Sequence, residues 1–185
     1  LEKAFGSWKA PAIAPGVKSV DMAPVTAPGR TVILVDKPGA VQSAIRVGHL
    51  MPRGLSEDDF DIRAMNDVLG GSFTSRLNMN LREDKGWAYG AGSNISSARG
   101  PQAFSASVSV QTDKTAAAMA EIDREIRELA STNPPSQEEI DLIVKGETLS
   151  LPGRFETNWS VMRYMQYVEH LDLPYDYVET LADRY

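Results

Sequence analysis

The amino-acid sequence predicts an α+β fold, in which helices pack on one face of an antiparallel sheet. Residues 41–50 and 102–112 alternate apolar and polar side chains, which is the period of a strand with one buried face. The segments between the strands repeat their apolar residues at helical spacing instead. Strands and helices also come in runs, in the order ββααββααα, and this grouping favours α+β over a parallel α/β sheet.

Four strands are predicted, the first two of them as a hairpin. "TVILVD" (31–36) is an apolar run, "KPGA" after it is typical of a turn, and "VQSAIRVGHL" (41–50) alternates with a period of two. We therefore expect residues 31–36 and 41–50 to form an antiparallel hairpin. Two further strands are expected at 87–97 and 102–112.

The helices are predicted from start and stop signals. "SEDDF" opens the first helix, with Ser56 as the cap and Asp59 three residues later, and Gly70-Gly71 ends it. The remaining helices are a short one that carries Leu77 and Leu81 and ends near Lys85, one at 113–130, one that begins with a capping box of Ser136 and Glu139, one at about 155–170, and one after Pro174.

The chain divides into a leading segment and one domain. Residues 1–9, "LEKAFGSWK", resemble the end of a helix whose body lies upstream, and residue 1 is not Met. Residues 10–30 carry four prolines and two glycines, a composition typical of an extended linker. We therefore expect residues 1–30 to hold the end of a preceding domain plus a Pro/Gly linker, and 31–185 to form the domain proper.

The composition excludes several classes of function. The chain of 185 residues is 42% hydrophobic and 24% charged, as in ordinary globular domains, and no stretch approaches the roughly 20 apolar residues of a membrane span. Its net charge of -6 argues against a surface for nucleic acid, because phosphate binding needs clustered basic side chains. The absence of cysteine excludes disulfides, thiolate metal sites and thiol catalysis.

Motifs that would indicate catalysis by this chain are missing. His49 and His170 belong to no metal-ligand spacing such as H-x-x-E-H, so both are interpreted as structural. The pair Asp58-Asp59 lies in the first turn of a helix, where the dipole favours acids. "LGGSF" lacks the spacing of a phosphate loop and is interpreted as a helix stop with a tight turn.

One polar pair has two interpretations. In "LREDKGWAYG" (81–90) a helix is expected to end at Gly86 and to lead into a strand, with Arg82 before the break and Tyr89 after it. In a structural role, Arg82 would favour the helix dipole and Tyr89 would pack its ring. In a functional role, the guanidinium and the phenol would lie at one sheet edge and donate hydrogen bonds to peptide carbonyls. The residues alone leave both interpretations open.

Four stretches of the sequence, in this order along the chain, carry a family resemblance. They are "AFGSWK", "VILVDKPGAVQSAIRVGHLMPRG", "VLGGSFTSRLNMNLREDKGWAYGAGS" and "FSASVSVQTDKTAAAMAEI". Together they resemble the insulinase/pitrilysin family of zinc metallopeptidases, in particular the C-terminal domain that follows the metal-bearing one and holds no metal. The resemblance extends over nearly the whole chain.

The resemblance implies a division of labour. Members pair similar α+β halves around a chamber, and one half binds zinc through H-x-x-E-H, whose Glu activates water. The other half contributes an Arg and a Tyr, seven residues apart, that bind the substrate backbone. Arg82 and Tyr89 match that spacing. The resemblance thus implies the substrate-binding half of a zinc endopeptidase for peptides or unfolded chains, with Arg82 and Tyr89 as substrate-binding residues.

The same resemblance implies partners outside this segment. The chain has no H-x-x-E-H, so no catalytic or metal-ligating residue is assigned to it, and zinc would be bound by a metal-bearing family domain in the same chain or in another subunit. A homodimer or heterodimer is compatible with this arrangement. The alternative is a catalytically inactive member that acts as a scaffold or assembly partner. The compartment is not determined, although the resemblance is compatible with the bacterial periplasm or cell envelope.

Overall fold

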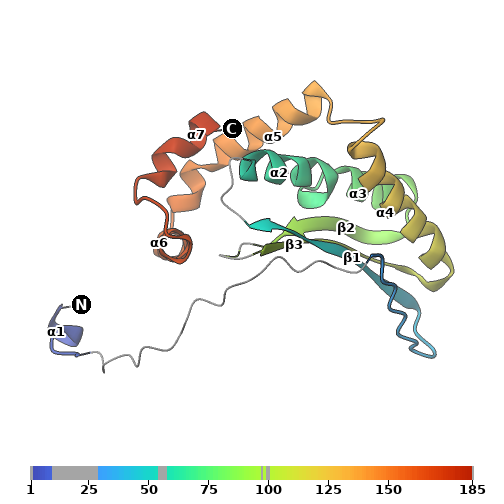
Figure 1. Ribbon diagram of the computed structural model, residues 1–185, viewed down its shortest axis with the longest axis horizontal. Coiled ribbons are helices and arrows are strands. Elements are labelled where there is room, and N and C mark those ends of the chain that lie inside the picture. The colour runs from blue at the N-terminus through green and yellow to red at the C-terminus, as the bar shows by residue number, and fades with distance from the viewer. Residues whose placement is uncertain (1, 10–28, 54–57, 97, 99–100, 185) are drawn as a thin grey trace.

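The computed structural model describes residues 2–9, 29–53, 58–96, 98 and 101–184. The chain forms a three-stranded antiparallel sheet covered by helices, so the predicted α+β class is confirmed (Figure 1). The elements are α1 (Glu2–Phe5), β1 (Gln42–Arg53), α2 (Asp59–Asn66), the π-helical turn η1 (Asp67–Gly71), α3 (Arg76–Asn78), the π-helical turn η2 (Met79–Asp84), β2 (Ala88–Ile95), β3 (Pro101–Gln111), the 3₁₀ turn η3 (Thr112–Lys114), α4 (Thr115–Leu129), α5 (Gln137–Ser150), the 3₁₀ turn η4 (Pro152–Phe155), α6 (Asn158–Leu171), the 3₁₀ turn η5 (Tyr177–Thr180) and α7 (Leu181–Arg184).

The sheet has the strand order β1-β3-β2. β3 lies in the centre and pairs antiparallel with both neighbours, so that Val108 is opposite Ile45 on one side and Ala91 on the other. The two strands predicted at 87–97 and 102–112 are present as β2 and β3, and they are antiparallel neighbours. β1, however, pairs with β3, which begins 48 residues after the end of β1.

The predicted hairpin of residues 31–36 with 41–50 is wrong. Residues 31–37 form no strand, and the side chains at 32–35 are 72–90% exposed. The backbone of β1 bonds to β3, and no described element covers the apolar run that precedes it. The turn itself is present, because Ala40 N donates to Lys37 O at 3.1 Å.

The core lies between the sheet and the helices on one of its faces (Figure 1). Ala106, Val108 and Val110 of β3 are buried there, as the alternating pattern predicts. The opposite face of β3 carries Ser107 and Ser109, which are exposed. Helix side chains complete the core, chiefly Val68, Leu69, Leu77, Leu81, Ala118 and Ile122.

The glycine pair does more than stop a helix. α2 continues without interruption into η1, so the helical path ends at Gly71, while Ser72 is extended. Gly70 is buried against β2, and a Cβ built on it would lie 2.4 Å from the backbone nitrogen of Ser93. Because real Cβ atoms do not approach backbone so closely, Gly70 is required for η1 to pack on the sheet.

The C-terminal helices follow the predicted order. α6 is the expected aromatic helix, and its Tyr164 and Tyr167 are half-buried while Trp159 is exposed. The predicted cap Ser56 and the linker residues 10–28 lie outside the described residues. Among the helices that are described, we find none with the length and apolar character needed to cross a bilayer.

The predicted capping box of α5 is confirmed. Ser136 Oγ accepts from Glu139 N at 3.2 Å, and Glu139 Oε2 accepts from Ser136 N at 2.8 Å. The same carboxylate binds Arg76 of α3 through two hydrogen bonds of 2.7 and 2.6 Å. Arg76 also donates to the carbonyl of Asn133 at 2.6 Å, so one arginine joins α3 to the start of α5.

This contact predicts a specific acid sensitivity. Hydrogen bonds from Arg76 hold the pKa of the Glu139 carboxyl at about 2, below its ordinary 4.5. A depressed pKa stabilises the fold above about pH 4.5, and the contribution is lost as the pH falls from there toward 2. Because the Glu139 side chain is 32% exposed, solvent screening leaves an expected contribution of about 1 kcal/mol.

Urea unfolding at pH 6, 4 and 2.5 measures the effect. Glu139→Gln should lower the unfolding free energy at pH 6 and should lose less stability than the wild type on acidification. Glu138→Gln is the matched control, because Glu138 lies in the same helical turn without an ion pair to any described residue. Parallel acid curves for the wild type and Glu139→Gln would contradict the assignment.

Candidate functional site

Arg82 projects from the π-helical turn η2. Its neighbour Leu81 is fully buried, and Leu77 one turn earlier is nearly so, which fixes this turn onto the core. Asn80 joins this turn to α4 by hydrogen bonds, because its Nδ2 donates to Glu125 at 2.7 Å and to Glu121 at 2.9 Å. The turn that carries Arg82 is therefore held rigidly between the sheet and α4.

The chain reverses at Gly86, as predicted. Gly86 has φ +62, a backbone conformation that favours glycine. Its N–H donates to Arg82 O at 3.1 Å, and the N–H of Trp87 donates to Leu81 O at 2.9 Å. These bonds satisfy the last carbonyls of η2 and direct the chain into β2, whose second residue is Tyr89.

Tyr89 lies in an irregularity of the sheet. Ala88 is opposite Val110 and Ala91 is opposite Val108, so β2 uses three steps where β3 uses two. The N–H of Ala91 accommodates this bulge by donating to Asn78 Oδ1 at 3.2 Å. A bulge re-aims the side chain that it contains, and Tyr89 is 93% exposed on the edge strand.

The structure brings Arg82 and Tyr89 together, with Phe73 as a third member. The Arg82 guanidinium carbon lies 5.6 Å from the centre of the Tyr89 ring and 4.7 Å from the centre of the Phe73 ring. Both distances are within the range of cation–π contacts. Phe73 is 63% exposed, and its carbonyl accepts from Asn78 Nδ2 at 2.7 Å. We call these three residues the Phe73–Arg82–Tyr89 stack.

The stack presents hydrogen-bond donors to solvent. Arg82 Nε is 3.3 Å from the Glu83 carboxylate, and we find no other polar partner for this guanidinium among the residues described. Over the same part of the chain, the Tyr89 hydroxyl also has no hydrogen-bond partner. The site can therefore donate to two acceptors at once from a rigid turn. In the structural interpretation, Arg82 would instead be directed at the carbonyls at the end of its own helix.

The sequence did not single out Phe73. It follows the glycine pair, in a stretch interpreted only as a turn, so its role depends on a contact nine residues away that no local pattern reveals. An exposed aromatic residue in a polar turn, "GGSFTS", was the available signal.

The other candidates have structural surroundings. His49 lies on β1, with its ring centre 5.5 Å from that of Phe104. Asp59 is buried, accepts from Arg63 Nε at 2.8 Å and from Gln102 at 3.1 Å, and thus forms a structural pair. Within the described ranges, no three His, Asp or Glu residues gather closely enough to hold a metal ion.

Comparison with known proteins gives consistent matches. The family model described as the peptidase M16 inactive domain matches residues 1–147. The curated relative "Uncharacterized zinc protease YmxG" of Bacillus subtilis is 36% identical over 92 residues, which cover 48% of this chain and 20% of that protein.

Solved structures share the fold. A protease from Helicobacter pylori superimposes with a TM-score of 0.72 at 18% identity, over 81% of this chain and 36% of that one. A peptidase M16 inactive domain from Pseudomonas fluorescens gives a TM-score of 0.67 at 20% identity, over 78% and 34%. The chain spans a fifth of the curated relative and about a third of these two structures.

Proposed function

The chain belongs to the M16 peptidase family, as its inactive domain, and we propose that it is the substrate-binding half of a zinc endopeptidase that acts on peptides or unfolded chains. Membership of a peptidase family supports a peptide as the substrate, and the curated relative is named a zinc protease. The contact between half-buried Arg82, whose only ion pair among the described residues is with adjacent Glu83, and exposed Tyr89 is the observation that carries the proposal.

The stack suits a peptide backbone. The Arg82 guanidinium offers a planar pair of N–H groups to a carbonyl oxygen, and the Tyr89 hydroxyl offers one O–H to a second oxygen. Because these donors address carbonyls rather than side chains, binding would depend on an extended backbone more than on sequence. Tyr89 lies on edge strand β2, where an extended peptide can be aligned with a sheet.

The residues that the structure describes do not fit a zinc site. The sequence lacks H-x-x-E-H, and no suitable cluster of three ligands occurs in the described ranges. We propose that zinc is held by a metal-bearing family domain, which is either another subunit or a domain that precedes residues 1–30. In this arrangement, residues 1–30 are the end of the preceding domain plus a linker, and 31–185 form the binding half.

Activity of the separated and combined halves tests the proposal. The 185-residue chain alone should show no chelator-sensitive cleavage of an unfolded protein or a quenched fluorescent peptide. Combined with its metal-bearing half, it should restore cleavage that is lost in chelator and regained with zinc. Chelator-sensitive cleavage by the chain alone would contradict the division of labour. A combined assembly that holds zinc and cleaves nothing would instead favour the scaffold role.

A further inference from the structure

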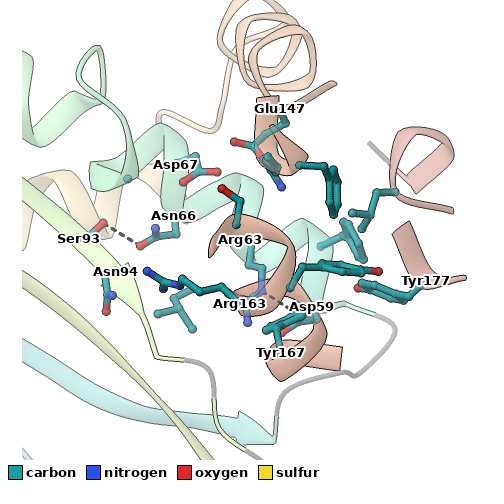
Figure 2. A pocket seen from close by; sticks show the side chains of 18 residues that line it. Asp59, Arg63, Asn66, Asp67, Ser93, Asn94, Glu147, Arg163, Tyr167 and Tyr177 are labelled. Atoms are coloured by element: carbon teal, nitrogen blue, oxygen red, sulfur yellow. Dashed lines mark hydrogen bonds and ion pairs between the residues drawn. The ribbon is translucent and has the colours of Figure 1, made fainter. Parts of the chain in front are cut away.

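A cavity lies beside Ser93 and Asn94, near the end of β2 (Figure 2). It has a volume of about 540 Å³ and opens between α2, the last residues of β2, and α6. Its wall on β2 is formed by Ser93, Asn94 and Ile95, four to six residues beyond Tyr89. At the rise of a strand this places the cavity roughly 13–20 Å from the Phe73–Arg82–Tyr89 stack. The cavity is thus a separate site.

Four charged side chains in the cavity wall already neutralise one another as two ion pairs. Arg63 donates from Nε to Asp59 at 2.8 Å, and the second oxygen of Asp59 accepts from Gln102 at 3.1 Å. Glu147 of α5 is paired with Arg154 of η4. These two pairs contribute no net charge to the cavity, so they do not call for a charged ligand.

Asp67 is an acidic residue in the cavity wall that belongs to neither of these ion pairs. It is half-buried in the cavity wall beside Glu147, and its carboxylate accepts from Asn66, yet it forms no ion pair with any described residue (Figure 2). Burial, and then the charge of Glu147, raise the pKa of Asp67. Arg63 and Arg154 act in the opposite direction, so the argument rests on geometry: the carboxylates of Asp67 and Glu147 face the same space, where a cation would be attracted.

Arg163 is a cationic residue in the cavity wall that also belongs to neither ion pair. Its side chain runs from α6 along the cavity toward Asn94 of β2 (Figure 2). In the part of the chain that the structure describes, Arg163 has neither an ion pair nor a hydrogen bond. A guanidinium with free donors beside a side-chain amide suits a carboxylate.

The remaining wall is aromatic. Tyr164 and Tyr167 of α6 and Phe155 of η4 line the cavity, with the rings of Phe155 and Tyr164 packed edge to face at 5.1 Å between centres. Such a surface accommodates an apolar side chain. The cavity therefore offers an acid, a guanidinium and an apolar wall in one space.

From this arrangement we propose that the cavity binds a short zwitterionic peptide of two or three residues. Its ammonium group would lie at Asp67, its carboxylate at Arg163, and an apolar side chain against the tyrosines. The volume is in the range of small-molecule sites and exceeds what one amino acid would fill. This inference does not depend on the proposed function of the stack.

Calorimetry on the 185-residue chain with Ala-Phe dipeptide tests the proposal. The dipeptide should bind, and its N-acetyl and C-amide forms should each bind at least about tenfold more weakly, because each lacks one charged group. Free phenylalanine should also bind more weakly. No binding of the dipeptide at millimolar concentration, equal binding of the N-acetyl form, or equal binding of phenylalanine would overturn the proposal.

Substitutions locate the site. Asp67→Asn and Arg163→Gln should each weaken dipeptide binding about tenfold or more. Asp123→Asn and Arg127→Gln are the matched controls, because these residues form an exposed ion pair on α4, away from the cavity, and they should not change binding. Arg163 forms no ion pair or hydrogen bond with a described residue, so its variant should fold even if Asp67→Asn does not. Unchanged affinity in Arg163→Gln would overturn the assignment.

Discussion

Arg82→Ala is expected to lower kcat/KM for peptide cleavage by the complete enzyme by about 10²–10³-fold, with no loss of bound zinc. The guanidinium contacts the rings of Phe73 and Tyr89, on a turn fixed by buried Leu81, so its donors are oriented before substrate arrives. Tyr89→Phe removes a single hydroxyl and keeps the ring against Arg82, so we expect a smaller loss of about tenfold.

Matched controls separate this effect from a general loss of arginine or tyrosine. Arg127 lies exposed on α4 and Tyr175 is exposed near the C-terminus, so Arg127→Ala and Tyr175→Phe should leave kcat/KM unchanged. Steady-state kinetics, zinc content and thermal unfolding should be measured on all four variants. Normal kinetics in both Arg82→Ala and Tyr89→Phe would reduce the pair to a structural cap.

Phe73 provides a finer test of the same site. Phe73→Leu retains an apolar side chain but removes the ring face that contacts Arg82, whereas Phe73→Tyr retains that face. If Phe73 positions Arg82, the leucine variant should raise KM severalfold and the tyrosine variant should restore it. Equal kinetics in both variants would exclude a positioning role for this ring.

Local patterns explain why the fold class could be predicted and one strand partner could not. The alternation of Phe104 to Val110 and the capping box of Ser136 and Glu139 depend on residues close in sequence, and both are present in the structure. The partner of β1 is chosen by contacts between distant residues, such as Ile45 with Val108. The apolar run at 31–36 satisfied the local signal for a strand, but no sequence period specifies which surface covers it.

In the site, too, local features could be predicted from the sequence and contacts between distant residues could not. The spacing of Arg82 and Tyr89 around Gly86 was visible in the sequence, and the family resemblance gave that spacing a meaning. The approach of the two side chains depends on the bulge in β2 and on the π-helical turn η2, each of which adds a residue to a regular element. Such insertions leave the apolar pattern almost unchanged. Phe73 was missed because it reaches Arg82 only through this geometry.

Gly70→Ala is expected to destabilise the fold by about 2–3 kcal/mol. Alanine favours helices over glycine by about 1 kcal/mol, so helix propensity alone predicts the opposite sign. The new methyl group, however, would lie 2.4 Å from Ser93 N and 2.9 Å from the carbonyl carbon of Gly92, both of them backbone atoms of β2. η1 would have to move away from the sheet, which would also disturb the buried Val68 and Leu69.

Gly146→Ala supplies the control that isolates this close approach. Gly146 is a helical glycine in α5, and a Cβ built on it meets nothing within 4 Å, so the substitution should stabilise the chain by about 0.5–1 kcal/mol. Urea or thermal unfolding should therefore give opposite signs for the same substitution in two helical segments. If Gly70→Ala also stabilised the chain, η1 would not pack on β2 as described. The placement of the turn beside the strand that carries Tyr89 would then be wrong as well, because both depend on the same contact between η1 and β2.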